Sequence, residues 1–221
     1  MTSETLTRVA LFPLSVVLFP QGVLPLRVFE ARYMDMVRDC MRDETSFGVC
    51  LTADGKSPST DTVLTTADVG CLARITAWDM QQLGFLQIRT VGGDRFRLLA
   101  SESQPNGLLV GEIDLIEADE DQPIPDEHRP CADLLTRIIE DMSAQLAEKR
   151  RTGEAADTSP VLAQLPFEEP YQLESSAWVS NRLCEVLPVP LKAKQKLMEL
   201  TDAATRLEIV HTYLKQHSVL K

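Results

Sequence analysis

The order of apolar and polar residues changes three times along the chain, and each change predicts a different kind of element. Two apolar runs punctuated by proline, 8–14 and 23–28, are typical of strands at the edge or corner of a sheet. Residues 29–41 repeat with the period of a helix, with apolar side chains on one face and charged ones on the other. From 47 to 116 the side chains alternate, which indicates half-buried strands.

Three short segments separate the alternating runs: 53–60, 92–94 and 104–107. They are rich in Gly, Pro and Asn, which supply the backbone angles of tight turns. Several short strands at near-regular spacing predict a meander that closes on itself, either a small barrel or a sandwich.

The second half of the chain is helical in pattern. The acidic, proline-interrupted segment 117–128 is expected to be exposed, and we place a domain boundary near Asp121. Beyond it, apolar residues at helical spacing predict a helix over 131–146. Three more helices are predicted at 171–187, 190–201 and 202–217, with Pro190 at a helix start and Asp202 as an N-cap. The fold class is therefore α+β, with residues 1–120 rich in strands and 121–221 forming a helical bundle.

The uncharged run from Val9 to Leu26 is about as long as a membrane-spanning helix. Pro13, Pro20 and Pro25 argue against a helix, because each interior proline costs roughly 3 kcal/mol. The run also lacks the flanks and cleavage site of a signal peptide. We expect it to be buried as strands in a soluble protein without a membrane segment.

Charge and cysteine content narrow the function further. The chain has 22 Lys+Arg and 33 Asp+Glu, and the net charge of −11 disfavours a general affinity for nucleic acid or anionic lipid. The 5 cysteines are far apart and odd in number, which fits buried reduced thiols in a cytoplasmic protein better than a metal knuckle or a disulfide framework.

Candidate catalytic motifs are weak. The Gly55–Ser57 stretch ends like a phosphate-binding loop, but its distance from Gly48 is wrong for one and Pro58 follows where a helix should begin, so a surface turn is favoured. His128, His211 and His217 lie in no metal-ligand spacing and are interpreted as solvated helix residues; no metal or cofactor is predicted. A Ser or Cys nucleophile that the fold brings to a histidine stays open.

Two charged groups have structural interpretations. Arg89, Arg95 and Arg97 are expected on a solvated strand face, although together they could form a basic patch. Glu30 lies at the start of the predicted helix, where it favours the helix dipole and could pair with Arg27.

Five short stretches carry a family resemblance through their joint order: 11–14 (LFPL), 19–20 (FP), 25–30 (PLRVFE), 47–49 (FGV) and 93–97 (GDRFR). Together they resemble the N-terminal, substrate-binding domain of the Lon protease family, especially its free-standing bacterial versions. The similarity covers 9–116, with a looser echo at 188–210, and Ala31 stands where relatives often have proline. It implies a PUA-like β-barrel followed by an α-helical bundle.

The resemblance implies a function as well. The ATPase and Ser-Lys peptidase modules of Lon have no counterpart in the sequence, so we expect a non-enzymatic protein that binds unfolded or exposed apolar polypeptide, in a cleft or along a sheet edge. Its partners would be polypeptide clients or a partner protease or chaperone, linking it to ATP-dependent proteolysis or protein quality control. The candidate contact residues are Phe19, Pro20, Leu24, Phe29 and Tyr33. The alternative is an RNA-binding PUA-like module, which would need Arg89, Arg95 and Arg97 on one exposed face.

Overall fold

The computed structural model describes residues 7–52, 66–82, 84–152, 159, 161 and 164–220. The chain divides into two compact units, Met1–Glu117 and Ala118–Lys221, called here the sheet unit and the helical unit. The turn predicted at Gly55–Ser57 lies outside the described residues.

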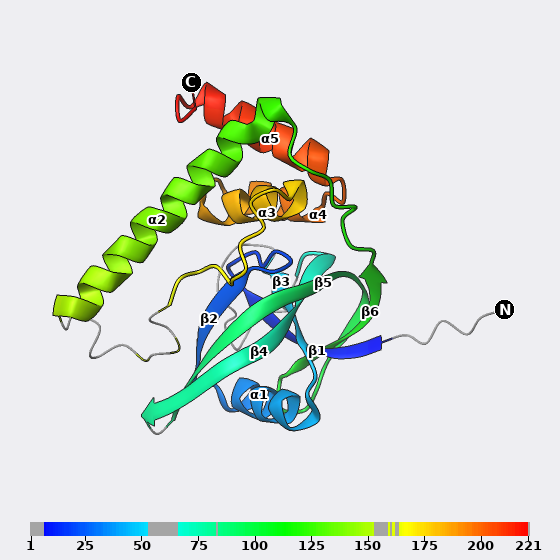
Figure 1. Cartoon of the computed structure of the whole chain (residues 1–221). Helices are drawn as coiled ribbons and strands as arrows, with labels where there is room; N and C mark the ends of the chain where they lie inside the picture. The colour runs from blue at the N-terminus through cyan, green and yellow to red at the C-terminus, as the bar shows by residue number, and fades with distance from the viewer. Residues whose placement is uncertain are drawn as a thin grey trace. The chain divides into compact units, whose positions relative to one another are not determined.

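The sheet unit contains six described strands (Figure 1). They are β1 (Thr7–Leu14), β2 (Val23–Val28), β3 (Phe47–Leu51), β4 (Val69–Gln82), β5 (Phe85–Ser103) and β6 (Leu109–Ile116). Their order is β2-β5-β4-β3-β1-β6, and β6 also pairs with β5. The pairings therefore return to β5 and form a ring of five strands, to which β2 adds through β5 alone.

The uncharged run from Val9 to Leu26 supplies most of β1, most of β2 and the loop that joins them, as its prolines predict. In β1 the side chains of Leu11 and Phe12 are both buried, because the strand is packed on both faces. Among the described residues, none of the helices combines the length and the hydropathy that crossing a bilayer requires.

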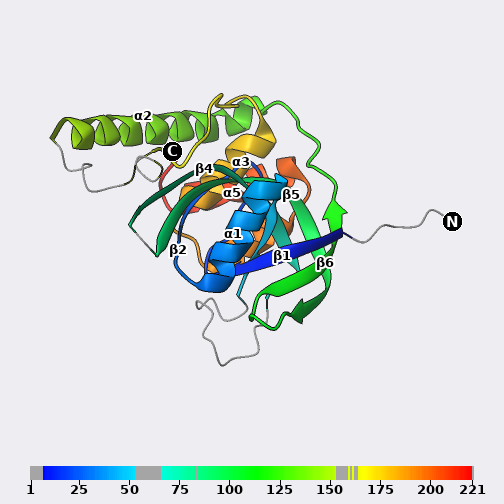
Figure 2. The same cartoon turned by 90° about the horizontal axis from the view of Figure 1, so that it is seen from below.

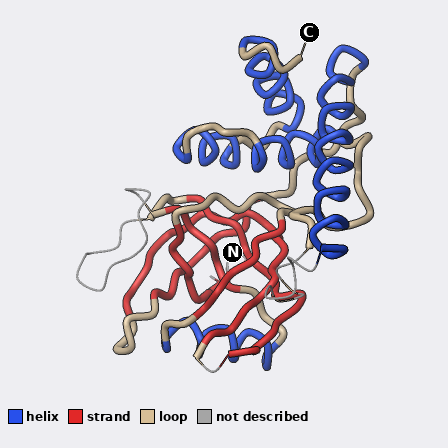
Figure 3. The backbone as a smooth tube through the Cα atoms, turned by 90° about the vertical axis from the view of Figure 1, so that its left-hand side faces the viewer, coloured by secondary structure: helices blue, strands red, loops and turns tan. Residues whose placement is uncertain are grey.

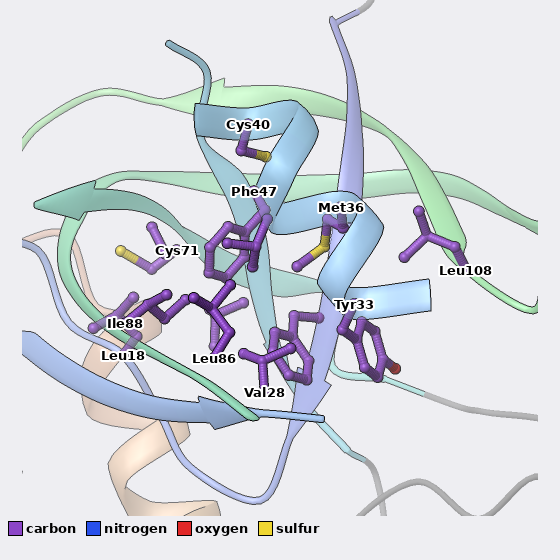
Figure 4. Packing of buried hydrophobic residues seen from close by; sticks show 14 residues of the cluster. Leu18, Val28, Tyr33, Met36, Cys40, Phe47, Cys71, Leu86, Ile88 and Leu108 are labelled. Atoms are coloured by element: carbon purple, nitrogen blue, oxygen red, sulfur yellow. The ribbon is translucent and has the colours of Figure 1, made fainter. Parts of the chain in front are cut away.

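Helix α1 (Ala31–Asp43) packs its apolar face against the strands (Figure 2). Tyr33 lies parallel to Phe12 of β1, with 4.0 Å between the ring centroids. Figure 4 shows the buried cluster that helix and strands share, which includes Met36 of α1, Phe47 of β3 and aliphatic side chains of β2 and β5. The predicted helix over 29–41 is confirmed, although it begins two residues later.

The structure corrects the turn predicted at 92–94. Gly92 and Gly93 lie inside β5, which continues without a break from Phe85 to Ser103. Gly92 exchanges backbone hydrogen bonds with the β1–β2 loop, donating to the Gly22 carbonyl and accepting from Gln21, both at 2.8 Å. A Cβ at Gly92 would lie 2.1 Å from the Phe19 carbonyl oxygen. The glycine therefore permits a close backbone approach within a strand, which is the other common use of glycine in sheets.

The helical unit contains η1 (Asp126–His128), α2 (Arg129–Thr152), α3 (Ser176–Val186), α4 (Leu191–Glu199) and α5 (Ala203–Gln216) (Figure 3). The four predicted helices are thus confirmed as elements, with α2 longer than its apolar pattern at both ends. Pro190 precedes α4, and the Asp202 carboxylate accepts the Thr205 backbone N–H at 2.5 Å, as expected of an N-cap.

Buried polar side chains hold the helical unit together. Arg206 of α5 is fully buried; its guanidinium donates to Ser180 Oγ at 3.0 Å, to the Leu200 carbonyl at 2.5 Å and to the Asp119 carboxylate. Asp119 lies in the acidic segment predicted to be exposed. That prediction holds for most of the segment, but Ile124 and His128 are buried, because this stretch of chain packs against the helices as well as meeting water.

Candidate functional site

Phe29 presents an apolar ring on the surface of the sheet unit. It directly follows β2, and 62% of the residue is exposed. Its ring centroid lies 6.3 Å from that of Phe85, the first residue of β5, and the Arg27 guanidinium carbon lies 4.1 Å from the Phe85 ring centroid. The cation–π contact restrains the Phe85 ring, and the Phe29 ring lies beside that ring.

Two further apolar side chains lie at the same end of the neighbouring strand β4. Trp78 pairs in register with Ile88 of β5, which pairs on its other side with Leu26 of β2. Because Ile88 and Phe85 are three residues apart on β5, their side chains point to opposite faces of the sheet. Trp78 and Met80 are both exposed. We call Phe29 and Phe85 the Phe29 surface: two neighbouring apolar side chains, one just after β2 and the other at the start of β5.

The five residues predicted to contact a client do not form one surface. Phe19 is fully buried and Tyr33 is buried in the core against Phe12, so both side chains belong to the interior of the sheet unit. Pro20 and Leu24 are half-buried, and Leu24 packs against the same core. Phe29 alone of the five exposes most of its side chain.

Side-chain contacts anchor the start of α1, next to Phe29 in the chain. The Glu30 carboxylate forms an ion pair with the Arg32 guanidinium, with 2.8 Å between Oε2 and Nη2. The predicted partner, Arg27, instead places its guanidinium over the Phe85 ring. Arg32 also donates to the Gly107 carbonyl in the β5–β6 turn at 2.8 Å. Arg32 therefore connects the start of α1 to the β5–β6 turn.

The three arginines of the predicted solvated strand face separate in the structure. Arg89 and Arg95 are buried, with 6% and 2% exposure, whereas Arg97 is exposed. The alternation of side chains in the sequence places them on β5 but does not show that parts of both faces are covered. The continuous exposed basic face that an RNA-binding module would need is therefore not formed by these three residues.

His128, Glu208 and His211 meet in the helical unit, although the sequence analysis interpreted both histidines as solvated. His128 Nε2 lies 2.6 Å from Glu208 Oε2, and the two imidazole rings lie edge to face with centroids 4.8 Å apart. Both histidines are buried, and burial lowers the pKa of His211, with further contributions from Lys215 and His128. His217, the third histidine, is exposed as predicted.

The sequence offered little signal for this cluster. Glu208 and His211 are three apart on α5 and share a face, but His128 is 80 residues away from Glu208. Only the packing of η1 against α5 brings them together.

All five cysteines are free and buried, as predicted. Burial raises the pKa of Cys50 and of Cys184 to about 12, and that of Cys131 to about 11. These three thiols therefore stay protonated at neutral pH and are poor nucleophiles.

Comparison with known proteins identifies the family. Residues 8–216 match the ATP-dependent protease La (LON) substrate-binding domain. The chain belongs to this LON substrate-binding domain family. The match extends over both units, and no catalytic domain is evident in the chain.

Solved structures share the LON substrate-binding domain fold. The Lon N-terminal domain protein from Xanthomonas campestris is 34% identical, with a TM-score of 0.70, and the comparison covers 94% of this chain and 98% of that one. The N-terminal domain of the Mycobacterium avium complex Lon protease is 15% identical, with a TM-score of 0.55 and coverage of 96% and 100%, which supports the fold alone. The LON-type fold here combines six strands and five helices within the described residues.

A Lon protease from Anaeromyxobacter dehalogenans (strain 2CP-C) is 24% identical over 208 residues. This LON domain alignment covers 93% of the chain but only 22% of the relative's length. The chain thus spans about a fifth of the length of that protease.

Proposed function

We propose that this LON substrate-binding domain protein binds unfolded or exposed apolar polypeptide segments without cutting them. Family membership supports a substrate-binding role, and the observation that carries the proposal is the exposed Phe29 ring beside Phe85. The setting is the cytoplasm, in ATP-dependent proteolysis or protein quality control, with a client polypeptide or a partner protease or chaperone. Buried, reduced cysteines are consistent with that compartment.

The chemistry is burial of apolar area. An apolar client side chain that packs on the Phe29 surface removes its own area and that of Phe29 from water, and full burial of one large side chain is worth about 1.5–3 kcal/mol. Phe85 is already held by Arg27, so little side-chain freedom is lost on its side of the contact. Several weak contacts of this kind suit a binder that accepts many sequences.

A sheet edge offers a second contact mode. In the described residues, β2 pairs with β5 on one side only, so an extended peptide can add to its other edge through backbone hydrogen bonds, except at Pro25, which has no N–H to donate. Phe29 follows directly after this edge, which allows one client segment to use both.

The finer architecture belongs to the same proposal. We infer that the ring of five strands is the PUA-like β-barrel of the resemblance, and that α2 to α5 form the helical bundle. We move the boundary between the folding units from near Asp121 to a position before Asp119, because the Asp119 carboxylate pairs with buried Arg206 of the bundle.

RNA binding is not favoured. Arg89 and Arg95 are buried and the net charge is −11, so these residues offer no exposed basic face to the phosphate backbone of an RNA.

The test measures binding of a fluorescently labelled, carboxymethylated polypeptide that cannot fold, by anisotropy. Phe29→Ser is expected to weaken binding about tenfold, which corresponds to about 1.4 kcal/mol. Leu115→Ser is the matched control, because Leu115 of β6 is a similarly exposed apolar residue (51%) outside the Phe29 surface. Circular dichroism confirms that both variants are folded. Wild-type protein that does not bind, or equal losses in the two variants, would contradict the proposal.

A further inference from the structure

The cluster of His128, Glu208 and His211 has the composition and geometry of a metal site. One potential ligand atom from each residue lies within 4.8 Å of the others. Two imidazole nitrogens and one carboxylate oxygen form a donor set that suits divalent first-row transition ions such as Zn²⁺, whereas Mg²⁺ and Ca²⁺ prefer oxygen ligands only.

An unpartnered atom points to a ligand that is not part of the protein. His211 Nε2 is buried and makes no hydrogen bond, although His211 is only 6% exposed. A buried nitrogen without a partner is costly, and few remain so in folded proteins. Its neighbours in the cluster are the His128 ring and the Glu208 carboxylate, so an ion there would satisfy it.

We propose that His128, Glu208 and His211 bind one divalent transition-metal ion, with Zn²⁺ as the representative. Metal–ligand bonds of about 2.0–2.2 Å place tetrahedral donors roughly 3.4 Å apart. His128 Nε2 and Glu208 Oε2, now 2.6 Å apart, would have to separate, and the widest pair, within 4.8 Å, would have to approach by up to ~1.4 Å. Glu208 provides that freedom, because 57% of its side chain is exposed. Three protein ligands leave a fourth position for water.

A second layer of contacts already orients the carboxylate. Thr212, one turn further along α5, donates from Oγ1 to Glu208 Oε1 at 3.2 Å and leaves Oε2 for the histidine side. Outer contacts of this kind fix the orientation of metal ligands in proteins. The ion would join η1, at the start of α2, to the middle of α5 and stabilise the helical unit.

The experiment uses the full chain without a histidine tag, treated with chelator and titrated with Zn²⁺ in a calorimeter. We expect one equivalent to bind and the melting temperature to rise. His211→Ala is expected to weaken binding by more than the roughly 10–100-fold that loss of an outer contact costs. His217→Ala is the matched control, because His217 lies on the surface just after α5 and should leave the affinity unchanged.

Two further measurements keep the outcome decisive. If His211→Ala fails to fold, Glu208→Gln tests the same site, since it removes the charge of an exposed side chain and keeps its shape. Co²⁺ spectra should show tetrahedral bands without a thiolate charge-transfer band, because the cysteines are not ligands. Zn²⁺ binding that is absent in the folded wild type, that survives both Glu208→Gln and His211→Ala, or that shows a thiolate band would overturn the proposal.

Discussion

The sheet unit and the helical unit differ in how completely they enclose charged side chains. The sheet unit buries two clusters of aliphatic and aromatic side chains, including Phe47, Ile88 and Phe96. It also buries Arg89 and Arg95, which keep 6% and 2% exposure, whereas the helical unit encloses Arg182 and Arg206 completely. Arg206 is satisfied by Ser180, a backbone carbonyl and Asp119, and Arg182 pairs with Glu185 at 2.9 Å.

This difference has an energetic consequence. Apolar packing tolerates substitutions that conserve volume, whereas a buried polar network depends on every partner being present. We therefore expect the two units to respond differently to the loss of a single charge and to a small change in shape.

The largest effect is expected when the buried ion pair of the helical unit is broken. Arg206→Met leaves the Asp119 carboxylate buried without its partner and should lower the free energy of unfolding by about 3–5 kcal/mol. Urea denaturation followed by circular dichroism measures the loss. Arg8→Met, in the exposed pair of Arg8 with Glu102 on the sheet unit, should cost about 0–1 kcal/mol.

A double variant sharpens this test. Arg206→Met combined with Asp119→Leu removes both charges and should recover much of the loss. Equal losses of unfolding free energy in Arg206→Met and Arg8→Met would show that the buried ion pair contributes no more to stability than the exposed one.

The next effect concerns shape in the sheet unit. Gly92→Ala places a methyl group against the Phe19 carbonyl and should destabilise the protein by about 1–3 kcal/mol, or more where the backbone must move. Gly93→Ala is the control, because its Cβ would meet nothing closer than 3.7 Å. Thermal unfolding compares the two, and a Gly92→Ala variant as stable as Gly93→Ala would refute the close approach.

A helix cap gives a smaller effect in the helical unit. Ser175 Oγ accepts the Trp178 backbone N–H at 2.9 Å at the start of α3, so Ser175→Ala should cost about 1 kcal/mol. Ser143→Ala, inside α2, should cost nothing or stabilise slightly, because Ala has the higher helix propensity. Urea unfolding of both variants decides whether the position within the helix matters.

The smallest effect is on the native cysteines, which should scarcely react. Because burial raises the pKa of Cys50, Cys131 and Cys184, thiol reagents at pH 8 should label the folded protein slowly and the urea-unfolded protein fast. Mass spectrometry then compares Cys50 of the sheet unit with Cys184 of the helical unit at intermediate urea. Faster labelling of Cys184 would show that the polar interior opens first; simultaneous labelling would indicate one cooperative unit.

Much of the fold was predictable because it follows from local periodicity. The proline-punctuated strands, the helix at α1 and the Asp202 cap depend on residues close together in sequence. The exception was Gly92, whose residue type fits a turn and a close approach equally well. Only the position of the Phe19 carbonyl decides between the two.

The candidate sites were less predictable, since they depend on which residues the fold buries. Phe19 precedes a proline and Phe29 precedes a glutamate in two neighbouring stretches, yet the first is fully buried and the second is exposed. The ion-pair partner of Glu30 could not be predicted from the sequence either, because Arg27 and Arg32 are both close to it in the chain. In the structure Arg32 pairs with Glu30, and Arg27 lies over the Phe85 ring. His128 and His211 required the packing of η1 on α5.

The ring of strand pairings limits how copies of this protein can aggregate. Of the six described strands, five have neighbours around the ring, and β2 keeps one side without a strand partner. Pro25 lies in the middle of β2 and has no N–H to donate, and the exposed Arg27 adds a charge that two abutting copies would have to bring together. Both features are common protections against edge-to-edge assembly into fibres. Pairing through this edge is therefore a poor route by which two copies of the chain could begin a fibre.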